Sequence, residues 1–273
     1  MDQVIVVTNF SGPSRNALDF TCHLLRGSQC EVLLLSIYHF SAGLSSDGVA
    51  MAAMAETLAA DNEALLQELD RARAMYPGIR IRGELVSGVF MEELRGRVQD
   101  VGADLVILGA QGTYSELMSW DAHIIDAFVD LEVPVLIVPG QVSYRPIRKI
   151  AFACNYYRKN LHAPVKRLHR FVAFTKAELS VINVVDPAEV IGPEALESKR
   201  VLQESLADLS PTYFEPAFEN VFEAIDAYTQ SARIDLLVVL PTRHGLWYRI
   251  FQQTHTRGLV YLNHIPVLSL HQE

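Results

Sequence analysis

Two glycines in the first half of the chain have the spacing of a phosphate-binding turn. Gly109 ends the short apolar run 104–108, and Gly112 follows three residues later, before a helical pattern. A second apolar run then begins at Val133 and ends at Gly140. Strand, glycine turn, helix and strand together make a βαβ unit of a parallel sheet. Glycine backbone can approach an anion closely and a helix N-terminus offers free N–H groups, so the stretch predicts a phosphate site.

Metal and nucleophile chemistry have weaker support in the sequence. The nine histidines form neither HxH nor HExxH. The sets weighed as ligands are His162 with His169, and His244 with His255 and His264, and ligand sites usually add carboxylates nearby. Three scattered cysteines make no CxxC pair, and no G-x-S-x-G elbow is present. We therefore predict no metal site and no catalytic residues.

The elements that would position the glycines alternate between strands and helices. Ser14 is predicted to cap the first helix, and Pro77 with Gly78 to stop a long second one. The predicted strands are 4–7, 31–38, 79–86, 104–108 and 135–138, and the predicted helices are 14–25, 49–75, 88–101 and one between Gly112 and Val133. The Ala- and Met-rich segment 50–60 is expected to lie on its own domain or on the twin of that domain. This order predicts a parallel sheet covered on both faces.

The second half repeats that order after a polar segment, 141–146, that reads as a linker. Its predicted strands are 149–154, 178–184, one near Tyr213, 235–240 and 267–270, and its predicted helices are 164–174, 193–209, 220–232 and 248–262. IVVTNF matches AFACNY with Asn9 over Asn155, at an offset of 146. ADLVIL matches IDLLVV at an offset of 131, and VPVLIV matches IPVLSL at 132. Three matches in one order indicate an internal duplication.

Composition limits the class of protein. Half of the 273 residues are hydrophobic and a fifth are charged, as in globular proteins with real cores. No apolar run approaches the ~20 residues that span a bilayer, and the N-terminus lacks the features of a signal peptide. Few cysteines and no leader predict a cytoplasmic protein without a membrane partner.

The net charge of −9 is unevenly distributed. Residues 1–140 hold 8 basic and 19 acidic residues, or −11, and residues 141–273 hold 15 and 13, or +2. An acidic first half argues against nucleic acid as a partner. Charge complementarity between two halves that pack together is the favoured interpretation, and a functional basic surface is the alternative.

With these features the sequence resembles the universal stress protein family in its tandem two-domain form. The segment 7–11, the glycine pair and the closing VPVLIVP carry the resemblance, which covers nearly the whole chain. It implies two doubly wound α/β domains with five parallel strands each, 1–140 and 147–273, the second copy degenerate. It also implies that the last strands, 135–138 and 267–270, pair the domains as an intramolecular pseudo-dimer. Further self-association and the protein partner stay open.

Nucleotide-binding members share G-x2-G-x9-G-[ST] and an Asp that holds adenine, and here the match is partial. Gly109 and Gly112 fit the pattern, whereas Ala122-His123 replace its last two residues. Asn9 takes the place of the Asp, which keeps an acceptor and adds a donor. Ile37 matches an apolar position whose backbone usually faces the nucleotide.

Two functions remain in competition. The first is a non-enzymatic stress-response or regulatory protein that acts through protein contacts, without a cofactor and with its nucleotide site largely lost. The second is an ATP or AMP sensor, or a slow ATP hydrolase, that uses the first-domain site. The missing glycine and hydroxyl in both copies favour the first function.

Overall fold

The computed structural model describes residues 1–38, 48–110, 120–154, 161–183, 193–215, 221–241 and 264–271. The chain divides into two compact units. The first contains Met1–Gln111, Leu117–Ala127 and Val135–Tyr144, and the second contains Phe128–Pro134 and Arg145–Glu273. No helix among the described residues is long and apolar enough to cross a membrane.

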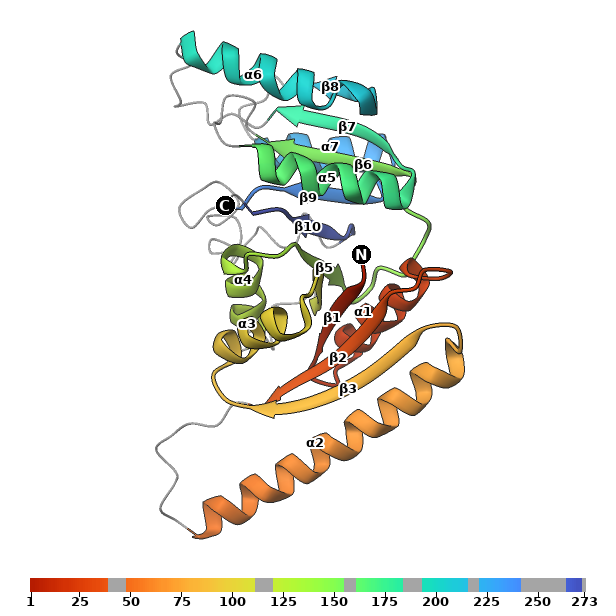
Figure 1. The fold of residues 1–273 in the computed structure, drawn as a ribbon, viewed down its shortest axis with the longest axis vertical. Helices are drawn as coiled ribbons and strands as arrows, with labels where there is room; N and C mark the ends of the chain where they lie inside the picture. Colours follow the sequence, from red (N-terminus) through yellow and green to blue (C-terminus); the bar gives the residue numbers. More distant parts are fainter. Residues whose placement is uncertain are drawn as a thin grey trace. The chain divides into compact units, whose positions relative to one another are not determined.

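The first unit is built on five parallel strands in the order β3-β2-β1-β4-β5 (Figure 1). The strands are β1 (Gln3–Thr8), β2 (Glu31–Tyr38), β3 (Arg80–Ser87), β4 (Leu105–Ala110) and β5 (Val135–Pro139). β1 and β4 are almost continuously buried, as expected of central parallel strands, and β5 at one end of the order is buried too, whereas β3 at the other end is half-buried. The predicted α/β fold class is confirmed.

Four helices cover this sheet: α1 (Gly12–Leu24), α2 (Gly48–Met75), α3 (Phe90–Val101) and α4 (Trp120–Asp130). The strand order first runs outward from β1 to β3 and then back through β4 to β5. Because crossovers between parallel strands are right-handed, α1 and α2 lie on one face and α3 and α4 on the other. The sheet is therefore doubly wound, as predicted.

The second unit repeats the arrangement in the order β10-β9-β6-β7-β8. Its strands are β6 (Lys149–Cys154), β7 (Glu178–Asn183), β8 (Thr212–Phe214), β9 (Leu236–Val239) and β10 (Val267–Ser269), and its helices are α5 (His162–Thr175), α6 (Pro193–Ser205), the short 3₁₀ helix η3 (Ala207–Leu209) and α7 (Val221–Ser231). The single helix predicted for 193–209 is thus divided into α6 and η3. The helix predicted for 248–262 lies outside the described residues.

Strand register confirms the internal repeat residue by residue. Val4 pairs with Leu105 in the first unit, and Ile150 pairs with Leu236 in the second. These pairs differ by the offsets of 146 and 131 found in the sequence. The same offsets also relate a side-chain hydrogen bond of the first unit to its counterpart in the second.

An aspartate before β4 and another before β9 hold the start of the neighbouring strand. The Asp104 carboxylate accepts from the backbone N–H of Asp2 at 2.6 Å, and the Asp235 carboxylate accepts from that of Arg148 at 2.9 Å. Both aspartates also donate their own backbone N–H to the strand that they hold. The duplication therefore preserves the hydrogen bonds as well as the topology.

The segment after β5 packs on α1 rather than leaving the unit at once. Asn16 donates its side-chain amide to the carbonyls of Pro139 and Val142, at 3.1 and 3.0 Å. The Tyr144 ring stacks on His23 with the ring centroids 5.4 Å apart. Residues 141–144 of the predicted linker are therefore fixed to the first unit, and the chain enters the second unit at Arg145.

Candidate functional site

The carboxyl end of β1 carries a cluster of hydroxyl groups. Thr8, the last residue of the strand, is 2% exposed and donates its hydroxyl to that of Ser14 at 3.2 Å. Ser14 is fully buried and donates to the Ser11 carbonyl at 3.0 Å. The buried hydroxyls thus satisfy one another and the first turn of α1.

Ser11, and not the predicted Ser14, caps α1. Its side chain accepts from the Ser14 N–H, and Pro13 follows in the first turn, where a missing N–H costs nothing. The prediction failed because each serine begins a plausible first turn. The structure selects Ser11 because Ser14 is needed in the buried hydroxyl cluster.

Asn9, the predicted base-holding residue, is exposed but already bonded. Its Oδ1 accepts from the Ser11 N–H at 3.2 Å and from the Ser11 hydroxyl at 2.6 Å. Because both groups donate, Oδ1 and not Nδ2 must face Ser11, which fixes the orientation of the amide. The acceptor that would hold an adenine amino group is therefore engaged within the loop.

Between these residues, Phe10 has a left-handed backbone, with φ of 62°. For a residue with a β-carbon this conformation costs about 1–2 kcal/mol. The Phe10 N–H donates to the Thr8 hydroxyl at 3.0 Å, and the Ser11 N–H donates to Asn9. These bonds offset the cost and hold the loop in one shape.

Gly109 needs to be glycine for a reason unrelated to phosphate. A β-carbon there would lie 2.1 Å from the Pro13 carbonyl oxygen and 2.7 Å from the Ser14 nitrogen. The first turn of α1 therefore packs directly against β4, backbone to backbone. Gly112, the second glycine of the motif, lies outside the described residues.

His123 lies in the first turn of α4 with its ring against α3. It stacks on Phe90 with centroids 4.5 Å apart and an interplanar angle of 14°. Phe90 is 2% exposed, so this contact joins the imidazole to the core under the two helices. Ala122 lies in the same turn, but its side chain is outside the described residues.

Ile37, the last of the predicted residues, lies near the end of β2 and is 9% exposed. Ile37 is in register with Val86 of β3, whereas the pairing of β2 with β1 ends one residue earlier, at Ser36. The structure thus brings Asn9, Gly109 and the start of α1 together near the carboxyl ends of β1 and β4. The His123 ring is directed at α3 instead.

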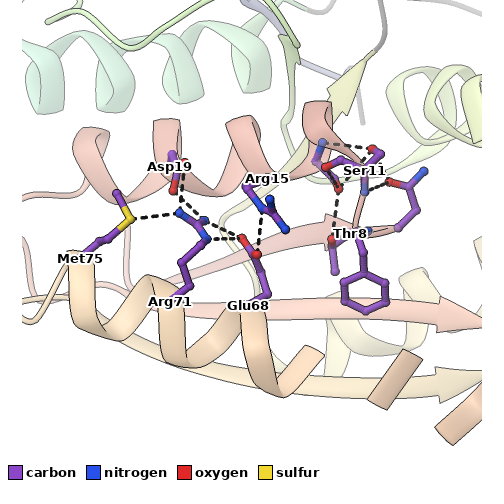
Figure 2. Close-up of polar contacts among 10 residues, drawn as sticks. Thr8, Ser11, Arg15, Asp19, Glu68, Arg71 and Met75 are labelled. Carbon is purple, nitrogen blue, oxygen red and sulfur yellow. Dashed lines mark hydrogen bonds and ion pairs between the residues drawn. The ribbon is translucent and has the colours of Figure 1, made fainter. Parts of the chain in front are cut away.

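A network of ion pairs between α1 and α2, which lie on the same face of the sheet, was not predicted (Figure 2). Glu68 of α2 has a side chain only 6% exposed and accepts from Arg15 at 3.0 Å and from Arg71 at 2.9 Å. Arg71 also reaches Asp19 at 2.8 Å. The network fastens the C-terminal half of α2 to α1. A carboxylate on the apolar stripe of Leu65 and its neighbours was the signal that could have revealed it.

Thiol and metal chemistry find no support in the described part of the chain. Burial raises the pKa of the Cys22 thiol to about 12, which removes the reactive thiolate at neutral pH. Cys30 and Cys154 are buried too. Among the described residues, no three His, Cys, Asp or Glu side chains gather as a metal site would require.

Comparison with known proteins identifies the architecture. A model of the universal stress protein family matches residues 1–139. No curated protein matches the chain. A universal stress protein from Archaeoglobus fulgidus DSM 4304 is similar with a TM-score of 0.70 at 14% identity, over 99% of this chain and 96% of that one.

Two further structures are similar. A functionally unknown protein from Pseudomonas aeruginosa PAO1 gives a TM-score of 0.57 at 19% identity, over 100% of this chain and 93% of that one. A universal stress protein solved in complex with cAMP matches 51% of this chain and 98% of its own, with a TM-score of 0.38 and 20% identity. The first two span this whole chain and share its fold.

Proposed function

Because the chain belongs to the universal stress protein family, we propose that it is a non-enzymatic stress-response or regulatory protein that acts through protein contacts. In this proposal the nucleotide site of the first unit has become part of the scaffold. The observation that carries it is the Asn9 side chain, whose acceptor oxygen is bonded twice to Ser11. An adenine amino group would have to displace these bonds.

Two neighbouring residues support the proposal. The His123 ring, in place of a Ser or Thr hydroxyl, stacks on Phe90. Gly109 accommodates the backbone of Pro13, so its presence is accounted for without a phosphate. Asn9, Ile37, Gly109, Gly112, Ala122 and His123 thus form the frame of a former site in this proposal.

Thermal unfolding with AMP, ATP–Mg²⁺ and cAMP at millimolar concentration tests the proposal. A ligand at a hundred times its dissociation constant would stabilise the native state by about 2.7 kcal/mol. We expect no shift with any of the three. A shift that saturates with nucleotide would contradict the proposal and favour the sensor or slow-hydrolase function.

The matched control restores the family residues together: Asn9→Asp, Ala122→Gly and His123→Ser. Asp keeps one oxygen for Ser11 and frees a second acceptor for adenine, while Gly and Ser return the phosphate turn. A shift in this variant alone would show that the assay detects binding and that these three positions removed it. Gly109 stays unchanged throughout because any β-carbon there clashes with α1.

The proposal also includes an intramolecular pseudo-dimer formed through β5 and β10. Parallel edge strands with exposed N–H and C=O groups tend to pair, and both strands are buried. Cysteines introduced in place of Leu136 and Leu268 would form a disulfide within one chain if the strands are neighbours. Failure to cross-link in the native state would remove this part of the proposal.

A further inference from the structure

α2 is longer than the strand on which it packs. Its 28 residues extend about 42 Å at 1.5 Å per residue, whereas the eight residues of β3 extend about 26 Å. The two elements run in opposite directions because only a short turn at Gly78 joins them. Figure 1 shows the N-terminal end of α2 reaching past the arrowhead of β3 and away from the sheet.

The buried part of α2 is confined to its C-terminal half. Leu65, Leu69 and Ala72 are 4%, 5% and 0% exposed, and Leu65 and Leu69 lie over Gly83 of β3. Upstream, nearly every described side chain is exposed or half-exposed, with Met51 at 63%. Among the described residues of the first unit, the sheet therefore covers one half of the helix and nothing covers the other half.

The overhanging half repeats the apolar pattern of the covered half. Met51, Ala55 and Leu58 precede the three buried residues by fourteen positions each, which is two heptads and the same face of the helix. Met54 completes the i, i+3, i+4, i+7 pattern. We call Met51, Met54, Ala55 and Leu58 the α2 seam. Asp61 separates the seam from the covered half.

Charge on the overhang excludes several partners. Glu56 is the only ionisable residue between positions 48 and 60, and it lies on the opposite side of the helix from the seam. The chain has no Lys or Arg from position 27 to 70, so an anionic lipid surface or nucleic acid has nothing to bind here. Two copies of the seam, in contrast, can pack together without repulsion between like charges.

The seam is also complementary to itself. In an antiparallel pair centred between positions 54 and 55, Met51 faces Leu58 of the second copy, and Met54 faces Ala55. Large side chains thus meet at both ends of the helix–helix contact, and a large residue meets a small one at its centre. In a two-fold dimer the same patch of both subunits must fit itself in this way. Exposed Ala52 and Ala59 beside the seam permit close approach of the helices.

From these observations we infer that the overhanging half of α2 is a self-association surface, which pairs antiparallel with the same helix of a second copy of this chain. Four residues per copy bury far less than the ~800 Å² per partner of a standard interface. The dimer is therefore weak and reversible, and its population depends on protein concentration. The inference is independent of whether a nucleotide binds.

Sedimentation of the full chain from micromolar to several hundred micromolar concentration tests the inference. We expect a monomer–dimer equilibrium in the wild type and a monomer at every concentration in Ala55→Glu, which places carboxylates at the dimer centre. Ala53→Glu is the matched control, because this exposed alanine lies on the opposite side of the helix. It should dimerise like the wild type, with unchanged helical circular dichroism in both variants.

Cross-linking tests the antiparallel direction. Because the native cysteines are all buried, a cysteine introduced on α2 supplies the accessible thiol for a disulfide between chains. A mixture of Met51→Cys and Leu58→Cys chains should form disulfide-linked dimers faster than either chain alone. The inference is overturned by a wild type that is monomeric at every concentration or by a dimer that survives Ala55→Glu. It is also overturned if each cysteine variant alone forms disulfide-linked dimers as fast as the mixture does.

Discussion

At the scale of single residues, the site is organised by packing between main-chain atoms. Gly109 admits the Pro13 carbonyl, and Asn9 closes its own loop onto Ser11. A nucleotide site would also select glycine at position 109, whereas Asn9 replaces the Asp of nucleotide-binding family members.

Gly109→Ala should destabilise the first unit by about 3 kcal/mol or more, because the new methyl group overlaps the Pro13 carbonyl. Urea unfolding followed by circular dichroism measures the loss. Gly96→Ala is the matched control, since a β-carbon there meets nothing within 4 Å and the helix gains about 1 kcal/mol. Equal effects at the two positions would contradict the packing role.

The sequence identified the residues around the candidate site but not their partners. The glycine at position 109 was found from its place after a strand, yet Pro13 is 96 positions away and nothing local connects the two. The stacking of His123 on Phe90 is equally non-local. The repeat and its offsets, in contrast, follow from hydrophobic patterns and were predicted correctly. The pairing of Val4 with Leu105 was first seen in the structure.

At the scale of elements, α2 is fastened to α1 through Glu68. Glu68→Ala removes three charged hydrogen bonds, one from Arg15 and two from Arg71. We expect a loss of about 2 kcal/mol in the free energy of unfolding. Glu63→Ala, on the exposed side of the same helix, should change stability by less than about 0.5 kcal/mol.

The duplicated helix ends offer a second comparison. α3 ends at Gly102 and α7 is followed by Arg233, both left-handed, and the residue after each donates to the equivalent helix carbonyl. Arg233→Gly should therefore stabilise the protein by about 0.5–1 kcal/mol. Arg233→Ala loses the same side chain but keeps the left-handed penalty, so it should bring no gain in a urea titration. A gain of equal size would contradict backbone strain as the cause.

The overhang of α2 could not be predicted from its sequence alone. Segment 50–60 was expected to lie on the first domain or its twin, because Ala, Met and Leu are residues of packed interfaces. The described side chains from Met51 onward are mostly exposed within the chain. The expectation that the segment lies on the first domain is therefore wrong, because helix length exceeds strand length there and a local pattern does not reveal this. The alternative, that it lies on the twin domain, stays a prediction.

At the scale of the molecule, the last described residue joins segments far apart in the sequence. His271 donates from Nε2 to the carbonyl of Phe128 at 2.8 Å, and both residues cluster with the second unit. Burial lowers the pKa of His271 and is the largest effect. The hydrogen bond to the Phe128 carbonyl opposes it, and the Arg167 guanidinium lowers the pKa again. The imidazole is therefore neutral in the native state at neutral pH.

This burial makes stability depend on pH. Between the lowered native pKa and the ordinary value near 6.5, the unfolded chain binds a proton that the native chain does not. The free energy of unfolding should fall as pH decreases from about 7 to about 5. In His271→Gln this slope should be shallower in urea titrations, whereas His162→Gln, at an exposed position, should keep it. An unchanged slope in His271→Gln would contradict the assignment.

The contact at Gly109 has a consequence for genetics. A saturation scan would find position 109 intolerant, just as it would find a ligand-binding glycine intolerant. Second-site suppression separates the two cases. The atoms that a methyl group would strike are the carbonyl of Pro13 and the nitrogen of Ser14. Both are main-chain atoms, so every amino acid at those positions has them. No single substitution at position 13 or 14 can therefore rescue a Gly109 variant, and a suppressor must instead displace the whole first turn of α1.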